Sequence, residues 1–171
     1  MNERIKGKTV AITGASGGLG MEIARQAAKS GANLILMARS LDKLEKLRDE
    51  LIANYSIKAS IYGLDVSKRG DIEDTFSKIE HEVGQIDVFV NNAGFGVFDS
   101  VLEMDLDEAE GMIETNVLGL ITCTKLVLPG MVSRRSGHII NIASQAGKMA
   151  TPKSSVYSAT KHAVLGFTNS L

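Results

Sequence analysis

Residues 10–20 read VAITGASGGLG, and this stretch decides the predicted fold. The apolar run Val10–Ile12 leads into a glycine-rich turn, and helical spacing follows from Leu19 to Lys29. A strand, a glycine turn and a helix form the opening of a nucleotide-binding βαβ unit. Glycine lets the backbone turn tightly and approach a pyrophosphate, and the helix N-terminus supplies free N–H groups. The alternative is a plain turn, but the flanking strand and helix favour a nucleotide site.

Strand and helix patterns alternate along the rest of the chain. Apolar strand patterns cover residues 33–38, 60–64, 86–90 and 138–142. Helical spacing separates them, and the helices are expected to bury Leu41, Leu44, Leu47 and Leu51; Ile72, Phe76, Ile79 and Val83; and Ile113, Val117, Leu120, Thr124 and Leu128. This alternation predicts one α/β domain over residues 1–171, with a doubly wound parallel sheet and helices on both faces.

Composition limits the classes of partner. The 171 residues include 44% hydrophobic and 23% charged residues, with a net charge of −1. This charge gives no electrostatic footprint for nucleic acid or an anionic membrane. The N-terminus lacks the apolar core of a signal peptide, and no apolar run looks long enough to span a bilayer. A cytoplasmic location is therefore expected.

Cysteine and histidine usage argues against metal and disulfide chemistry. The single cysteine, Cys123, cannot form an internal disulfide, and its apolar neighbours predict a buried, inert thiol. The histidines His81, His138 and His162 have no metal-ligand spacing, and neither CxxC nor HExxH occurs. We expect no protein-bound catalytic metal.

The end of the second predicted strand bears on cofactor choice. Ala38-Arg39-Ser40 contains no acidic residue, and Arg39 follows Gly20 by 19 positions. In dinucleotide folds this region faces the adenosine ribose, where an acid favours NAD. A guanidinium can instead pair with a 2′-phosphate. We predict that NADP(H) is preferred while NAD(H) remains possible; the alternative is a solvated arginine at a helix start.

Tyr157 and Lys161 lie four residues apart in a helical pattern, so they share one helix face. A nearby positive charge favours the phenolate and lowers the pKa of a tyrosine from about 10. Such a tyrosine can act as an acid/base catalyst. The alternative is a solvated pair. Only Tyr157 among the three tyrosines has a lysine at this spacing.

Three further polar features lie near predicted strand ends or helix faces. The fourth strand runs into Asn91-Asn92-Ala93-Gly94, whose small residues let the backbone approach a ligand. Asn116 lies beside an apolar helix stripe and is either a satisfied core amide or part of the site. Ser144 follows the fifth strand without a Gly-x-Ser-x-Gly elbow, which argues against a nucleophile; it is either an ordinary loop serine or a hydroxyl that hydrogen-bonds a substrate oxygen.

Together these motifs resemble the short-chain dehydrogenase/reductase family, in the subgroup with a TGxxxGxG cofactor loop. The landmarks occur in order and at similar spacing: Thr13-Gly14-(x3)-Gly18-x-Gly20, Asp65, Asn91–Gly94, Asn116, Ser144 and Tyr157-x-x-x-Lys161. The resemblance covers the whole chain and implies a Rossmann-type fold. The TGxxGxxG pattern of the extended subgroup is absent.

The resemblance implies an NADP-dependent oxidoreductase that transfers hydride between nicotinamide and a small alcohol or carbonyl compound. Tyr157 would be the general acid/base. Lys161 would hold the nicotinamide ribose, Ser144 would position the carbonyl, and Asn116 would anchor a proton-relaying water. The implied cofactor-binding residues are Gly14, Ser16, Gly18, Leu19, Gly20, Arg39, Ser40, Asp65, Val66, Asn92, Ala93, Gly94, Tyr157 and Lys161.

The resemblance also sets expectations about size and assembly. Family members continue into a sixth and a seventh strand, whereas this chain stops at Leu171 inside a helical pattern, so a truncated C-terminal part is expected. Homodimers or homotetramers are common in the family. Met149, Ala150 and residues 95–98 indicate only an apolar wall for the substrate. The alternative functions are a nucleotide-binding sensor or regulator on the same scaffold, or a chain that is inactive because part of its pocket is absent.

Overall fold

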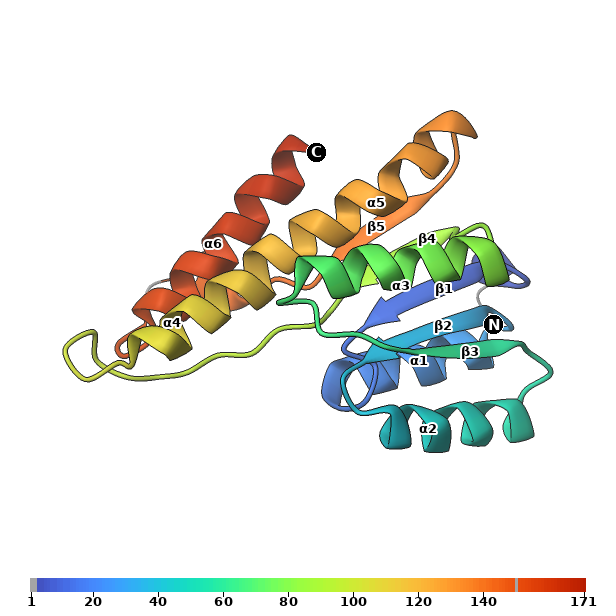
Figure 1. Cartoon of the computed structure of the whole chain (residues 1–171), viewed down its shortest axis with the longest axis horizontal. Helices are drawn as coiled ribbons and strands as arrows, with labels where there is room; N and C mark the ends of the chain where they lie inside the picture. Colours follow the sequence, from blue (N-terminus) through green and yellow to red (C-terminus); the bar gives the residue numbers. More distant parts are fainter. Residues whose placement is uncertain (1–2, 150) are drawn as a thin grey trace.

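Five parallel strands form one sheet in the computed structural model, which describes residues 3–149 and 151–171. The strands are β1 (Thr9–Thr13), β2 (Asn33–Ala38), β3 (Ala59–Gly63), β4 (Val88–Asn91) and β5 (His138–Asn141), in the order β3-β2-β1-β4-β5. In this register Ile12 lies opposite Leu36 on one side and Val90 on the other. The chain therefore winds outward from β1 in both directions, which confirms the predicted doubly wound sheet (Figure 1).

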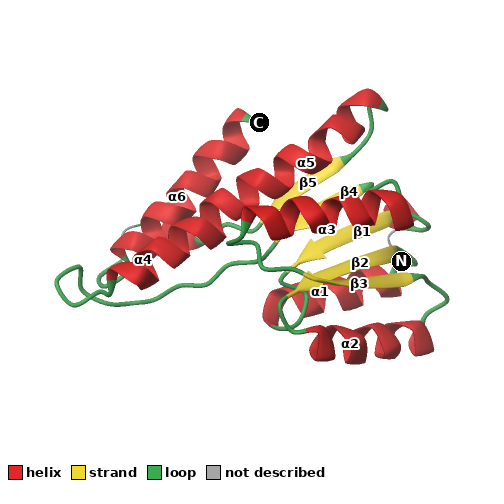
Figure 2. Cartoon of the chain, viewed as in Figure 1, coloured by secondary structure: helices red, strands yellow, loops and turns green. Residues whose placement is uncertain are grey.

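Helices cover both faces of this sheet (Figure 2). The helical segments are η1 (Glu3–Ile5), α1 (Gly18–Lys29), α2 (Leu41–Asn54), α3 (Arg69–Glu82), α4 (Leu106–Ile113), the π-helix η2 (Glu114–Gly119), α5 (Leu120–Ser133), η3 (Gln145–Gly147) and α6 (Ser155–Ser170). Helices α1 and α2 pack on one face, and α3 and α5 pack on the other. Helix α6 packs against α4, η2 and η3, beyond the β5 edge.

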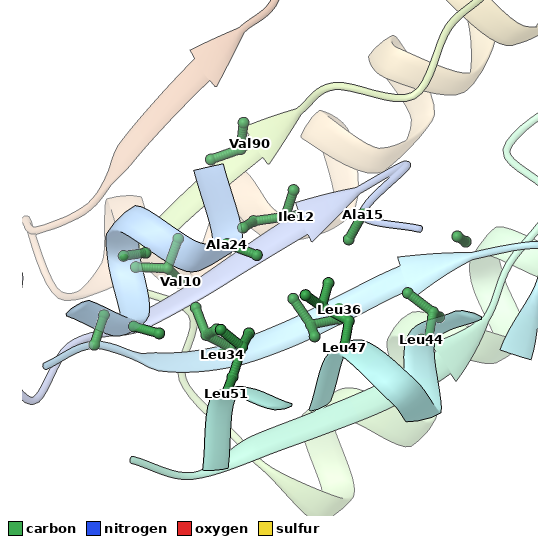
Figure 3. Packing of buried hydrophobic residues seen from close by; sticks show 14 residues of the cluster. Val10, Ile12, Ala15, Ala24, Leu34, Leu36, Leu44, Leu47, Leu51 and Val90 are labelled. Atoms are coloured by element: carbon green, nitrogen blue, oxygen red, sulfur yellow. The ribbon is translucent and has the colours of Figure 1, made fainter. Parts of the chain in front are cut away.

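The two faces of the sheet carry separate apolar clusters, because successive strand side chains point to opposite faces. One cluster joins β1 and β2 to α1 and α2 through residues that include Val10, Ile12, Ala24, Leu34, Leu36, Leu44, Leu47 and Leu51 (Figure 3). The other includes Ala11, Ile35 and Phe89, which pack against α3 and α5. Burial on both faces explains why these strands read as continuous apolar runs.

Three residues expected on inner helix faces are exposed instead. Leu41, Val83 and Ile113 are 47%, 38% and 39% exposed. Leu41 begins α2, Val83 caps the C-terminus of α3, and Ile113 ends α4 at the start of the π-helix. Leu41 and Val83 lie at helix ends, which extend beyond the sheet that the helices cover. Ile113 lies where the wider π turn begins, and this turn rotates the apolar face of the helix.

One continuous helical stretch is longer and more apolar than expected. Leu106–Ser133 has 28 residues and a mean hydropathy of 1.4 in its most apolar window, which is long and apolar enough to cross a bilayer by length and composition. The expectation that no apolar run reaches this length was wrong. Only 39% of that window is buried. The buried side chains of α5, such as Cys123 and Val127, pack in the core against the sheet, so core packing accounts for part of this apolar character.

The close packing of η2 against the loop after β3 predicts a large effect at Gly119. A Cβ at Gly119 would lie 2.4 Å from the Val66 carbonyl oxygen. Gly119→Ala should lower the free energy of unfolding by roughly 1–3 kcal/mol through overpacking. Gly166 in α6 has open space around its Cβ position, so Gly166→Ala should raise that free energy by roughly 0.5–1 kcal/mol. Urea unfolding measures both, and changes of the same sign would contradict the prediction.

Candidate active site

The carboxyl ends of the five strands meet at one edge of the sheet, because all pairings are parallel. The glycine turn follows β1 there, the segment from Asn91 follows β4, and the residues leading to α6 follow β5. The connections from β1 and β4 lead to helices on opposite faces, so a crevice is expected between these two strands. The predicted site residues gather at this edge.

The glycine turn folds tightly against the segment after β4. Gly14 has φ +67°, and a Cβ there would lie 2.9 Å from the Ala93 Cα. A Cβ at Gly20 would lie 2.4 Å from both the Gly14 oxygen and Asn92 Nδ2. Thr13 Oγ1 accepts hydrogen bonds from the Asn92 and Ala93 N–H groups, each at 3.0 Å. The glycines therefore let the turn pack closely against Asn92 and Ala93, and Asn92 holds the two loops together.

A hollow of about 450 Å³ lies beside the end of β2. Its lining includes the predicted residues Gly14, Ser16, Arg39, Ser40, Asp65, Val66, Ala93 and Gly94. It also includes Lys43, Glu114 and Thr115, which the sequence analysis missed. The sequence could have indicated Lys43, because this second basic residue follows Arg39 by four positions and lies in the first turn of α2. The hollow therefore carries two cationic side chains.

Asp65 is the acidic group predicted for this hollow. Its Oδ1 accepts hydrogen bonds from the Ser67 N–H at 3.1 Å and the Ser67 hydroxyl at 2.8 Å. Burial raises the pKa of Asp65, but the hydrogen bonds from Ser67 and the charges of Lys68 and Arg39 outweigh it, so this pKa lies below its ordinary value. Asp65 is therefore ionised at neutral pH, and its negative charge partly offsets the positive charge of Arg39.

A second hollow, of about 360 Å³, adjoins the first at Gly14, Ala93, Gly94 and Phe95. The predicted residues on its lining are Gly14, Gly18, Leu19, Asn92, Ala93, Gly94, Tyr157 and Lys161. Phe95, Gly96 and Phe98 also line it, as expected for an apolar wall. Met149 is 66% exposed and does not contribute to that lining, and Ala150 lies outside the described residues. The two hollows share these four lining residues, and their combined lining, called the groove below, extends from Arg39 to Tyr157.

Tyr157 and Lys161 lie one turn apart on α6, as predicted. Lys161 Nζ lies 5.8 Å from the centre of the Tyr157 ring and donates a 2.8 Å hydrogen bond to the Ile142 carbonyl. Lys161 is 6% exposed, and burial lowers its pKa. Phe98 packs on Tyr157 with ring centres 5.3 Å apart. The Tyr157 phenol and the buried Lys161 ammonium thus line the same hollow.

Asn116 lies in the π-helix and is 1% exposed. Its Oδ1 accepts from the Phe95 N–H at 3.0 Å, and its Nδ2 donates to the Phe95 carbonyl at 2.8 Å and to Thr160 Oγ1 at 3.1 Å. The side chain lines neither hollow. Asn116 is therefore a satisfied core amide that also holds the loop bordering the groove.

Ser144, a predicted site residue, lines neither of the two hollows. Its hydroxyl oxygen caps η3 by accepting a 3.2 Å hydrogen bond from the Ala146 N–H. Ala143 lines the second hollow, whereas Ser144 does not. The hydroxyl proton of Ser144 has no acceptor among the described residues. The structure thus brings the neighbouring backbone to the groove and leaves the role of Ser144 a prediction.

Cys123 lies outside the groove. It is fully buried at 0% exposure, and desolvation raises the pKa of its thiol to about 12. A thiol in this environment is a poor nucleophile at neutral pH. The structure agrees with the predicted buried, inert cysteine.

A model of the short chain dehydrogenase family matches residues 8–171. The NADP-dependent 3-hydroxy acid dehydrogenase of Schizosaccharomyces pombe is 39% identical over 98% of this chain and 66% of its own length. An alcohol dehydrogenase from Thermococcus sibiricus, complexed with 5-hydroxy-NADP, has a TM-score of 0.93 and 35% identity over 96% of this chain and 70% of its own. Escherichia coli serine dehydrogenase has a TM-score of 0.86 and 37% identity over 95% and 74%. The chain thus spans only part of the length of these relatives.

Proposed function

Because the chain belongs to the short-chain dehydrogenase/reductase family, we propose that it is an NADP-dependent oxidoreductase that interconverts a small alcohol and its carbonyl compound. One observation carries this proposal: two adjoining hollows with shared lining residues bring together the glycine turn, Arg39, Tyr157 and Lys161. The names of two relatives support 3-hydroxy acids as the substrate class, since serine is itself a 3-hydroxy acid.

The residues of the groove fit NADP. Gly14 and Gly20 leave no room for a Cβ, which suits a turn that approaches a pyrophosphate. The side chains of Arg39, Ser40 and Lys43 make no ion pair or hydrogen bond within the described residues, so their donors are available to a 2′-phosphate. Two relatives support this assignment, one named NADP-dependent and one complexed with 5-hydroxy-NADP.

The proposed chemistry follows from the positions of the side chains. A bound nicotinamide would supply the redox chemistry, as the hydride acceptor in oxidation of the alcohol and the hydride donor in reduction of the carbonyl compound. Tyr157 accepts the hydroxyl proton in oxidation and donates a proton to the carbonyl oxygen in reduction. Lys161 supplies a buried positive charge beside Tyr157, and we assign it the role of holding the ribose. We propose that Ser144 donates a hydrogen bond to the substrate oxygen, because its hydroxyl proton has no acceptor among the described residues.

A direct assay tests the proposed function against the sensor alternative. NADPH formation from NADP⁺ is measured at 340 nm with L-serine and with 3-hydroxybutyrate, and NADPH oxidation is measured with a panel of small aldehydes and ketones. Turnover with any of these compounds supports an oxidoreductase. Tight NADPH binding without turnover in either direction favours a nucleotide sensor or an incomplete pocket.

Arg39→Ala should weaken binding of ligands that carry a 2′-phosphate. Loss of a charge-assisted contact should raise the Kd for 2′,5′-ADP by roughly 10- to 100-fold while leaving that for 5′-AMP unchanged. Isothermal titration calorimetry measures both, and Lys43→Ala should give a smaller loss in the same direction. Equal losses for the two ligands, or a clear preference of the parent for NADH over NADPH, would contradict the assignment.

Assembly and location also remain proposals. We propose a homodimer or homotetramer, supported by an apolar hollow of about 630 Å³ between α5 and α6 that Ile121, Leu128, Val132, Phe167 and Leu171 help to line. Light scattering tests this, and a monomer at high concentration would reject it. The cytoplasmic location and the absence of membrane and nucleic-acid partners stay predictions from composition.

A further inference from the structure

Thr160 carries one of the buried hydroxyls beside the site to which the chemistry proposed above gives no role. Thr160 lies between Tyr157 and Lys161 on α6 and is 0% exposed. Its Oγ1 donates a 2.7 Å hydrogen bond to the Tyr157 carbonyl and accepts a 3.1 Å hydrogen bond from Asn116 Nδ2. The bond to Asn116 is buried and the bond to the Tyr157 carbonyl is partly buried, so solvent does not readily replace the Thr160 hydroxyl.

The partner of Thr160 connects it to the wall of the groove. Asn116 binds both backbone groups of Phe95, at 3.0 and 2.8 Å. The next residue, Gly96, lies against the ring of Tyr157, since a Cβ at Gly96 would be 2.8 Å from Cδ2 of that ring. A closed circuit of contacts therefore runs from the Tyr157 carbonyl through Thr160, Asn116 and the loop back to the Tyr157 ring.

An ordinary helix threonine does not make such a circuit. Thr122 donates to the Leu118 carbonyl at 2.8 Å, and threonine hydroxyls commonly bond to the preceding helical turn in this way. Thr160 makes the same kind of local bond but also accepts from a buried side-chain amide on another helix. Its loss would therefore remove the hydrogen-bonded link from α6 through Asn116 to the loop and not merely alter one helical turn.

We propose that Thr160 is a positioning residue that fixes the Tyr157 ring against the loop after β4, through Asn116. The inference rests on the proposed function only where it concerns catalysis. Reaction rates fall steeply when a catalytic group is misplaced, by about 100-fold for 1 Å. Thr160 lines neither the Arg39 hollow nor the hollow at Tyr157, so its loss should change the Kd for NADPH far less than kcat.

The test compares Thr160→Val, which keeps the shape but removes the hydroxyl, with Thr160→Ser, which keeps the hydroxyl. Thr122→Val removes a local helix bond at a residue that lines neither hollow and is the matched control. We expect Thr160→Val to lower kcat for NADPH formation from L-serine or 3-hydroxybutyrate by roughly 10- to 100-fold, with a far smaller change in the Kd for NADPH. Thr160→Ser should restore most of this kcat, and Thr122→Val should match the parent.

A second readout does not require turnover. The NMR signals of the Tyr157 ring, assigned by their loss in Tyr157→Phe, should shift in Thr160→Val but not in Thr160→Ser or Thr122→Val. An unshifted ring in Thr160→Val overturns the proposal, as does a lower kcat that Thr160→Ser does not rescue. If the parent shows no turnover, the proposed function fails, and the ring signals still decide whether Thr160 positions Tyr157.

Discussion

Tyr157→Phe is expected to lower kcat by roughly 10²- to 10⁴-fold, because it removes the only group assigned to transfer the substrate proton. The phenylalanine ring keeps the packing against Gly96 and Phe98, so the groove should retain its shape. The Kd for NADPH should therefore stay close to that of the parent. Stopped-flow absorbance at 340 nm and NADPH fluorescence titration measure the two quantities separately.

The matched control for this change is Tyr55→Phe. Tyr55 is half-buried at the end of α2 and packs against the apolar cluster of α1 and α2, away from the groove. Its variant should turn over like the parent. Full activity in Tyr157→Phe would rule out the assigned mechanism, and a large loss of NADPH affinity in that variant would show that the ring serves binding and not proton transfer.

The sequence is a reliable guide wherever local pattern and burial agree. Asn33–Ala38 is predicted and observed with the same bounds, because an apolar run buried on both faces has one stable conformation in a parallel sheet. The glycine turn and the Tyr157–Lys161 pair are likewise recognised from short-range spacing. These features depend on contacts within a few residues or on one helix face.

Features that depend on tertiary contacts are not visible in the sequence. The π-helix at Glu114–Gly119 accompanies the approach of Gly119 to the Val66 carbonyl, two segments that meet only in the fold. Asn116 could be assigned as a core amide or as a site residue, because its partners Phe95 and Thr160 lie 21 and 44 positions away. Long-range hydrogen bonds of this kind determine how the site residues are positioned relative to one another.

Lys161→Met is expected to lower kcat/KM by about 100-fold or more, because the positive charge beside the proton-transferring phenol is lost. Its stability should depend on pH in a defined direction. In the unfolded chain a lysine has a pKa of about 10.4, and burial lowers the value for Lys161 in the folded chain. Between the two values the unfolded chain holds more protons, so the parent gains stability as pH rises through this interval.

Methionine has no proton to lose, so Lys161→Met lacks this gain. The stability of the variant relative to the parent should therefore decline as the pH rises toward about 10, even if the variant is the more stable protein at neutral pH. Urea unfolding over this pH range measures the difference, and Lys78→Met, at an exposed position of α3, is the control. A difference in stability that does not change with pH would mean that burial does not lower the pKa of Lys161. The loss of activity would then reflect only the missing ammonium and its hydrogen bond to the Ile142 carbonyl.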